Sequence, residues 1–405
     1  MSNRASSRWI VLAAFAGVAG ASQMLWLNFA PLITLLQQRY GVSELAASVP
    51  TLVFPLFYVL LSLHAGAMVD RRGFKFTVAL GSYLMAAFSL LRIYDAYWAV
   101  LAGQIGIAIG QPYVMNGISK LVSDWFDEDE TALATGLGTV GMFVGCALGM
   151  ALTPALVAVN YTFAMIVFAL IAIALALVFA RYARENPECP NQTPEQSGWR
   201  EIRNLLDNPF QVRVFILSFL GLGFFNGLTT WLEQILAPNG ISADDAGLIG
   251  GMFIVGGIIG AMLIPALSDR SQRRKPFLTL CVLMGLVLVG PLCRVTTLGH
   301  GLVLAGILGF FFLPAYALLL AISEELAGRD KAGMATGILM LVGNAGGVAV
   351  IIGMSLVKGD NPLWSNAIDL MVALLAISLT LCFFLRETFI REGNNGREQK
   401  HDTVR

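Results

Sequence analysis

The stretch Gly66-Ala-Met-Val-Asp-Arg-Arg-Gly-Phe-Lys75 separates two long apolar runs, and Pro265-Ala-Leu-Ser-Asp-Arg-Ser-Gln-Arg-Arg-Lys275 does the same further along the chain. The Asp-Arg pairs of the two stretches are 199 residues apart. An Ala-Thr-Gly tripeptide also occurs twice, 201 residues apart, each time at the start of an apolar run. A near-constant offset between such motifs indicates a chain built from two halves with the same plan.

The composition places this duplicated chain in a membrane. Of its 405 residues, 57% are hydrophobic and 13% are charged, about half the charged fraction of a soluble domain. The 26 basic and 26 acidic residues balance, so no polyanionic partner such as nucleic acid is expected. A soluble enzyme, a disordered chain and a secreted disulfide scaffold are disfavoured too. The expected surroundings are a lipid bilayer.

Twelve apolar runs reach the length of about 20 residues that a helix needs to cross a bilayer. The predicted fold class is therefore all-α integral membrane, with twelve transmembrane helices in two pseudo-symmetric six-helix bundles. The predicted spans are 9–34, 46–69, 75–94, 97–120, 131–156, 161–181, 211–236, 245–268, 276–297, 300–323, 332–357 and 364–386. The first run is too long for a signal peptide and is interpreted as the first span.

The basic residues predict the orientation of these spans. One set of loops and both termini hold 22 of the 26 Lys and Arg residues, and such loops face the cytoplasm. Both termini are therefore expected in the cytoplasm, with the protein in a cell membrane, inner or plasma. The predicted organisation is a first bundle at 1–182, a linker at 183–210, a second bundle at 211–387 and a cytoplasmic tail at 388–405.

The first quoted stretch resembles the signature loop of the major facilitator superfamily, G-x-x-x-D-R-x-G-[RK]-[RK]. The positions that fit are Gly66, Asp70, Arg71, Gly73 and Lys75. Phe74 departs from the pattern, and the second copy keeps Asp269 and Arg270 but has Pro265 in place of the Gly. The resemblance implies that these seven fitting residues latch the two bundles together and serve gating. The alternative is that the basic residues only set the topology.

Shorter segments resemble one subfamily, that of the feline leukaemia virus subgroup C receptor. They include Leu25-Trp-Leu-Asn-Phe-Ala-Pro31, Gly110-Gln-Pro-Tyr113 and Lys120-Leu-Val-Ser-Asp-Trp-Phe126. That subfamily is linked to choline, ethanolamine and haem. The resemblance implies an alternating-access transporter of a small organic solute, with a choline-like or ethanolamine-like cation as the leading candidate and facilitated diffusion as the mode. By analogy with the superfamily, a monomer is expected.

Candidate substrate-binding residues lie in the four spans that line the central cavity in this family. Polar side chains are costly at membrane depth and usually face a cavity or another helix. The candidates are Gln23, Trp26 and Asn28 in the first span, Gln111, Tyr113 and Asn116 in the fourth, Asn226, Thr229, Trp231, Glu233 and Gln234 in the seventh, and Tyr316 in the tenth.

Two of these residues match the subfamily's pocket. Trp26 falls on its substrate-contacting Trp and Gln111 on its pocket Gln, whereas Asn226 stands where the subfamily has a Tyr. A Trp face attracts a cation by about 0.5–2 kcal/mol. The alternatives are that Trp26 only packs and that Gln111 only bonds a neighbouring helix. Glu233 has two interpretations of equal weight: a site residue, which pairs with a cationic substrate or carries a coupling proton, or a residue of the outer rim.

Rival functions are a proton-coupled exporter of drugs or metabolites, a haem or porphyrin exporter, and a membrane receptor that does not transport. The predicted first, fourth and fifth spans hold no Asp or Glu, which favours facilitated diffusion over proton coupling. His64 lies in the second predicted span, His300 at the outer turn where the tenth begins and His401 in the tail, and these positions disfavour haem ligation. We expect no catalytic residue, metal or cofactor, because the sequence has no CxxC pair and the spans show no nucleophile–base pair.

Overall fold

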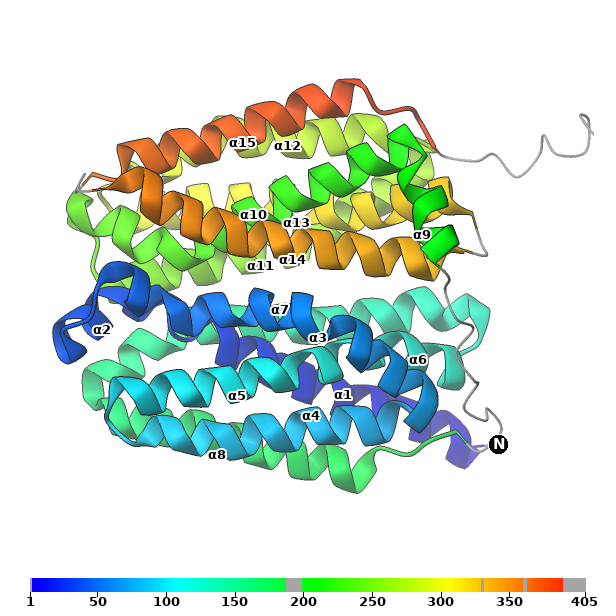
Figure 1. The fold of residues 1–405 in the computed structure, drawn as a ribbon, viewed down its shortest axis with the longest axis horizontal. Coiled ribbons are helices and arrows are strands. Elements are labelled where there is room, and N and C mark those ends of the chain that lie inside the picture. Colours follow the sequence, from blue (N-terminus) through cyan, green and yellow to red (C-terminus); the bar gives the residue numbers. More distant parts are fainter. Residues whose placement is uncertain (1, 187–198, 329–330, 360–362, 389–405) are drawn as a thin grey trace, which may run out of the picture.

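The computed structural model describes residues 2–186, 199–328, 331–359 and 363–388, and these residues form helices joined by short loops (Figure 1). The first group of helices is α1 (Ser2–Leu27), η1 (Ala30–Leu32), α2 (Ile33–Tyr40), α3 (Glu44–Arg72), α4 (Phe74–Ser89), η2 (Leu90–Ile93), α5 (Tyr97–Met115), α6 (Gly117–Trp125), α7 (Glu128–Val159) and α8 (Tyr161–Tyr182). The second group is α9 (Trp199–Leu206), α10 (Pro209–Leu236), η3 (Ala237–Asn239), α11 (Ala243–Ser271), α12 (Lys275–Leu292), α13 (Leu298–Ala327), α14 (Ala332–Lys358) and α15 (Ser365–Phe383).

The twelve predicted spans correspond to these helices. Within the described residues, 11 helical segments are long and apolar enough to cross a membrane. The remaining predicted span, 97–120, is divided at Asn116 into α5 and α6, and α5 carries the polar residues Gln104 and Gln111. Figure 1 shows α5 running beside α4 with the same inclination as the other long helices. The prediction of an all-α membrane fold is confirmed.

The first span differs from its predicted bounds because its helix is broken. α1 ends at Leu27, and the chain continues through η1 and α2 to Tyr40. Pro31 explains the break: it has no N–H to donate to the carbonyl of Leu27, and its ring clashes with that carbonyl in a continuous helix. Residues 26–30 at this break are all buried.

The two groups of helices lie one above the other in Figure 1. Each group contains close helix–helix contacts at glycine residues. A methyl group added at Gly145 on α7 would overlap the carbonyl oxygen of Gly20 on α1. In the second group, a methyl group at Gly346 on α14 would overlap the carbonyl oxygen of Phe219 on α10. These pairs occupy corresponding places in the two halves. In both halves, glycines thus let two membrane helices come into close contact.

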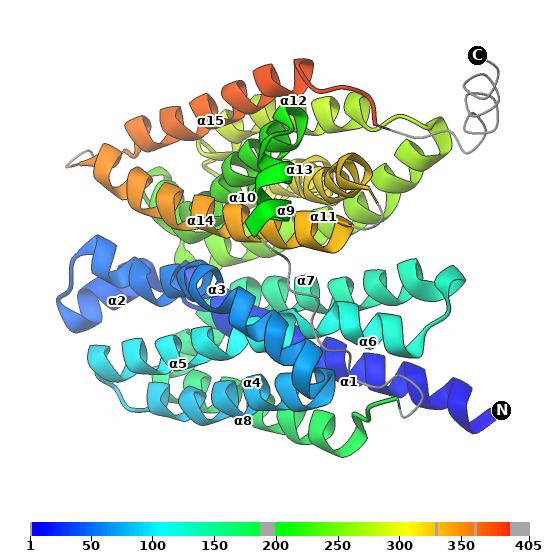
Figure 2. The ribbon, with the colours of Figure 1, turned by 45° about the vertical axis from the view of Figure 1, so that its right-hand side comes forward.

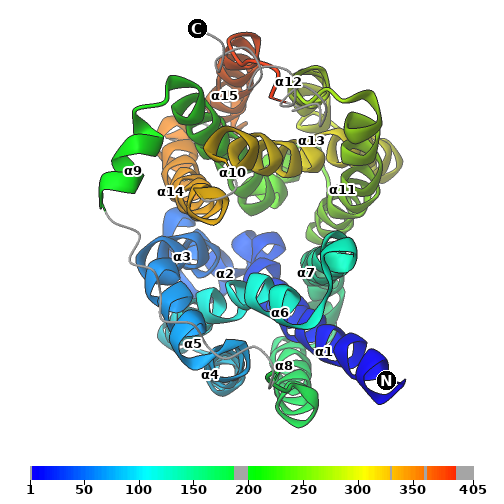
Figure 3. The same ribbon diagram turned by 90° about the vertical axis from the view of Figure 1, so that its right-hand side faces the viewer.

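Two helix pairs join the halves. Figure 3 shows α3 beside α14 on one side of the junction and α7 beside α11 on the other. The first turn of α1 and the last turn of α15 lie at the same end of the molecule (Figure 2), which we call the near end. The opposite end, with the turns at Gly41, Asn160 and Gly240, is the far end.

Candidate functional site

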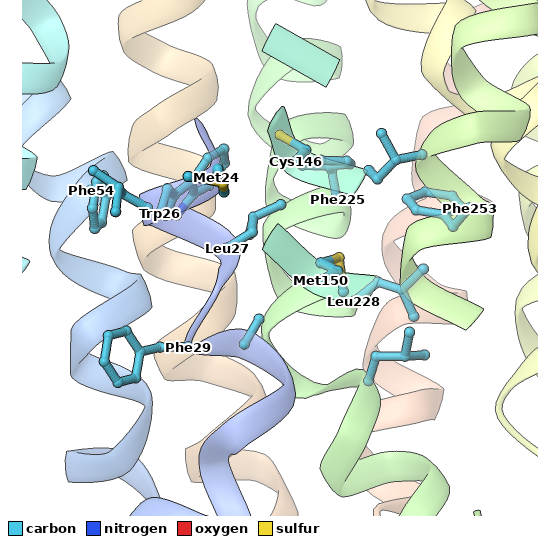
Figure 4. Packing of buried hydrophobic residues seen from close by; sticks show 14 of the residues in the cluster. Met24, Trp26, Leu27, Phe29, Phe54, Cys146, Met150, Phe225, Leu228 and Phe253 are labelled. Atoms are coloured by element: carbon cyan, nitrogen blue, oxygen red, sulfur yellow. The ribbon is translucent and has the colours of Figure 1, made fainter. Parts of the chain in front are cut away.

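Trp26 lies where the two halves meet. The residue is 9% exposed, and its indole N–H donates to the carbonyl of Thr51 on α3 at 3.2 Å. The ring centroid is 6.3 Å from that of Phe54 and 6.4 Å from that of Phe225 on α10 (Figure 4). The indole is therefore fixed by the first half while its ring contacts the second half.

The aromatic contacts continue from Trp26 into the second half. The ring of Phe225 is 6.0 Å from that of Phe253 on α11, and Phe253 is 6.4 Å from Phe312 on α13. Phe312 in turn lies 4.6 Å from Phe224. Aromatic faces carry partial negative charge and attract cations. We call Phe54, Trp26, Phe225, Phe253 and Phe312 the aromatic series.

Gln111 lies on the face of α5 that also carries Gln104. Gln104, seven residues earlier and therefore on the same helical face, donates its amide hydrogens to the carbonyls of Leu25 and Pro50 at 3.2 and 3.1 Å. Gln111 is only 4% exposed, and its amide makes no hydrogen bond to another described residue. Its side chain is thus buried near α1 with donor and acceptor capacity unused.

Gln23 lies one helical turn before Trp26 and has weak partners. Its amide nitrogen is 3.5 Å from the sulfur of Met115, and its amide oxygen is 3.9 Å from the thiol sulfur of Cys146. Sulfur is a poor donor and acceptor, so this amide also keeps capacity for a polar ligand. Asn28 is fully buried, and neither amide atom has a partner among the described residues.

Tyr113 and Asn116 contact α3. The phenol oxygen of Tyr113 is 2.9 Å from Nδ1 of His64. The Asn116 amide donates to the carbonyl of Ser62 at 3.1 Å and accepts from the hydroxyl of Tyr58 at 3.3 Å. Both side chains thus hold the broken helix α5–α6 against α3, with partners that do not depend on a substrate.

Three of the candidates on α10 have partners inside the second half. Asn226 and Thr229 bond the carbonyls of their own helix at 2.8 and 2.7 Å. Trp231 donates to the carbonyl of Ile351 at 3.0 Å and its ring lies 4.9 Å from that of Trp364, inside the second half. Phe225 is the α10 residue that meets Trp26, although it was not among the predicted site residues. A Phe inside an apolar run carries no signal of its own.

Glu233 and Gln234 meet the first half at the far end. The Glu233 carboxylate accepts from the hydroxyl of Thr34 at 2.5 Å and from its backbone N–H at 3.3 Å. The Gln234 amide donates to the Thr34 hydroxyl at 2.5 Å and to Glu233 at 3.0 Å. These three residues form what we call the far-end latch. Glu233 is 4% exposed, so its charge depends on these donors.

A second polar contact between the halves also lies at the far end. Lys358, the last residue of α14, forms an ion pair with Glu44, the first residue of α3. The ammonium group also lies 5.0 Å from the ring centroid of Trp364. Together with the far-end latch, this ion pair closes the junction of the halves at the far end.

The predicted gating residues lie at the near end, and their hydrogen bonds and ion pairs to other described residues stay within one half. Gly73 ends α3 with φ of 85°, and the next helix α4 has its Lys75 N–H bonded to the carboxylate of Glu185 at 2.8 Å. Asp70 and Arg71 are exposed. Burial raises the pKa of the Glu185 carboxyl above its ordinary value, an effect that the Lys75 N–H partly offsets.

The same arrangement recurs in the second half. The carboxylate of Glu387 accepts from the backbone N–H of Arg274 at 2.6 Å and from that of Lys275 at 3.2 Å. The Arg274 side chain pairs with Asp269 and, at 3.0 Å, with Glu325. Arg270 is exposed and Gly66 is half-buried. Glu185 and Glu387 were not among the predicted site residues, although their separation of 202 residues repeats the internal offset.

The sequence pattern of the Major Facilitator Superfamily matches residues 14–238 and 232–405. The chain belongs to the major facilitator superfamily. Its fold agrees: it superposes with a TM-score of 0.71 on a bacterial homolog of the human lysosomal transporter Spinster in an inward-facing conformation, at 16% identity, covering 93% of this chain and 96% of that one.

Named relatives support the resemblance to the feline leukaemia virus receptor subfamily. The Choline/ethanolamine transporter flvcr2a of Danio rerio is 23% identical over 374 residues, which cover 85% of this chain and 79% of that protein. The Choline/ethanolamine transporter FLVCR1 of Felis catus is 24% identical over 360 residues, covering 82% of this chain and 64% of that protein. The similarity thus extends through both halves.

Proposed function

We propose that this transporter carries a small organic cation of the choline or ethanolamine type by facilitated diffusion. The observation that supports it most is the position of Trp26: its ring contacts Phe54 of the first half and Phe225 of the second. Gln23, one helical turn before it, and Gln111 on α5 are buried amides with unused capacity. A quaternary or primary ammonium group is attracted to such a ring, and a substrate hydroxyl can bond an amide. The names of the relatives point to the same class of substrate.

The cation is recognised in this proposal without a carboxylate at the Trp26 face. Glu233, the acidic candidate on α10, is engaged by Thr34 at the far end. Attraction to π faces suits the quaternary trimethylammonium head of choline, which has no N–H to donate to a carboxylate. Asn226 stands where the subfamily has a Tyr, and its amide bonds the backbone of α10. The neighbouring Phe225 supplies an aromatic surface close to that position.

In this proposal, transport occurs when the two halves move relative to each other. We place the near end in the cytoplasm of a plasma or inner membrane, because it carries most of the basic residues. The structure then corresponds to an inward-facing state whose outer side is closed by the far-end latch and by Lys358 and Glu44. Breaking these contacts while the near-end loops come together exposes Trp26 to the opposite side, which is alternating access.

The test is ligand-dependent stability of the purified protein. At 100 times its dissociation constant, a ligand that binds only the folded state stabilises it by about 2.7 kcal/mol. We expect choline and ethanolamine to raise the unfolding midpoint, whereas organic anions of similar size leave it unchanged. Stabilisation by porphyrins alone would favour a porphyrin exporter and contradict the proposed substrate.

The far-end latch favours one alternative, a proton-coupled exporter. Protonation of Glu233 removes the charge that Thr34 and Gln234 stabilise, and thereby weakens a contact between the halves. Measured transport that requires a pH gradient and is lost in Glu233→Gln would support this function over facilitated diffusion.

A further inference from the structure

A pocket of about 90 Å³ extends from the aromatic series into the second half. Its walls come from α10, α12, α13 and α15, with Phe143 of α7 added from the first half. The residues that matter here are Gly221, Leu222, Phe225, Phe312, Leu313 and Tyr316. The pocket therefore reaches the junction of the halves and is not enclosed within one of them.

The lining of this pocket is apolar. Two of its lining residues carry hydroxyl groups, Ser378 and Tyr316. The Ser378 hydroxyl is already bonded to the carbonyl of Leu374 at 2.8 Å. No Asp, Glu, Lys or Arg is among the lining residues. A charged group would lose its hydration there without compensation, so the pocket suits a hydrocarbon group.

Phe225 connects this pocket to the Trp26 face. It lines the pocket, and its ring is 6.4 Å from that of Trp26. Phe312, further along the aromatic series, lines the pocket as well. One ligand can thus place a cationic head against Trp26 and an apolar group past Phe225.

We propose that the site takes ammonium ions that bear one apolar substituent of about three to four carbons, with the head at Trp26 and the substituent in this pocket. The inference rests on the proposed function and narrows its substrate class. The size follows from the volume, since a dry cavity of about 150 Å³ holds a benzene-sized ligand and this pocket is smaller. Tyr316, a predicted substrate-binding residue, then contacts the substituent rather than the head.

The experiment measures dissociation constants for alkyltrimethylammonium ions, from tetramethylammonium to octyltrimethylammonium, by calorimetry on the purified protein. Each buried methylene contributes about 0.8 kcal/mol, which is about fourfold in affinity. We expect this gain per carbon up to about butyl and little gain beyond. Equal affinity for tetramethylammonium and butyltrimethylammonium would overturn the inference.

A pocket-filling variant tests the location. A methyl group added at Gly221 meets no atom within 4 Å, so the first carbon of the side chain in Gly221→Leu has room, and the rest of that side chain takes up space in the pocket that Gly221 lines. It should abolish the gain with chain length and leave tetramethylammonium affinity within about twofold. Gly290→Leu is the matched control, because Gly290 also has open space around it but lies outside the pocket. A retained chain-length gain in Gly221→Leu would contradict the assignment.

Other outcomes separate this inference from the proposed function and from occupation by lipid chains. If tetramethylammonium and choline both fail to bind, the proposed function is refuted and this inference with it. If they bind but chain length has no effect, only this inference is refuted. If neutral alkanols bind as tightly as the matching ammonium ions and Trp26→Ala leaves both unchanged, the pocket takes acyl chains independently of the cation face, and the inference is overturned.

Discussion

The far-end latch predicts that a single hydroxyl group controls how often the far end opens. Thr34→Val removes the donor that lies 2.5 Å from the Glu233 carboxylate and the acceptor that Gln234 uses, while keeping the shape of the side chain. A hydrogen bond to a charged group contributes about 1.5–3 kcal/mol. Water replaces this bond when the far end is open, so its loss penalises only the closed state.

The expected size is a change of about 10- to 150-fold in the open-to-closed ratio, since 1.36 kcal/mol corresponds to a factor of ten. The assay is the rate at which a membrane-impermeant maleimide, added at the far side, modifies a cysteine introduced at Leu32. Leu32 is 2% exposed in η1, which packs against α10. Its modification therefore requires opening, and the rate follows the open population.

The control for this prediction is Thr279→Val. Thr279 is also half-buried, but its hydroxyl bonds the carbonyl of Lys275 within α12 at 2.8 Å. Its replacement should leave the modification rate of the Leu32 cysteine unchanged. Equal rates in Thr34→Val and in the unmodified background would refute the latch.

Three further predictions concern the site, the helix packing and pH. Trp26→Ala should weaken choline binding by about 2- to 30-fold through loss of the cation–π attraction. Trp231→Phe should instead lower the unfolding midpoint and leave the dissociation constant for choline unchanged. Calorimetry measures the dissociation constants, and thermal unfolding measures the midpoints. Gly145→Ala should lower the unfolding midpoint strongly because the added methyl group overlaps α1, and Gly136→Ala, which meets no atom within 4 Å, should not. Burial raises the pKa of the Glu185 carboxyl, so its contribution to stability is greatest below the ordinary carboxyl pKa and is lost as pH rises through the raised value. The unfolding midpoint of Glu185→Gln, measured relative to that of wild type, should therefore rise over that pH range. A difference between the two midpoints that stays constant with pH would contradict this.

Much of the fold could be predicted from sequence because membrane helices and internal repeats leave strong patterns. The lengths of the apolar runs predict the spans, and the offset between the two Asp-Arg pairs predicts the two halves. The division at Asn116 could not be predicted, since a helix whose end is held by side-chain bonds to Ser62 and Tyr58 has no distinct composition. The break after Leu27 has a local signal in Pro31, which a run-length criterion ignores.

The site was harder to predict because nearly all faces of a membrane helix are apolar. Periodicity then does not distinguish a face that meets lipid from one that meets another helix. Trp231 and Trp26 look equivalent in sequence, yet one packs against Trp364 and the other against Phe225. Which Trp meets the junction depends on neighbours more than 100 residues away, and the sequence of either helix does not contain that information.

The most direct test of the central claim is uptake of radiolabelled choline into liposomes that contain the purified protein. The account predicts saturable uptake down the choline gradient without an imposed pH gradient, reduced in Trp26→Ala and retained in Trp231→Phe. Uptake no faster than in empty liposomes, or saturable uptake that Trp26→Ala leaves unchanged, would contradict it.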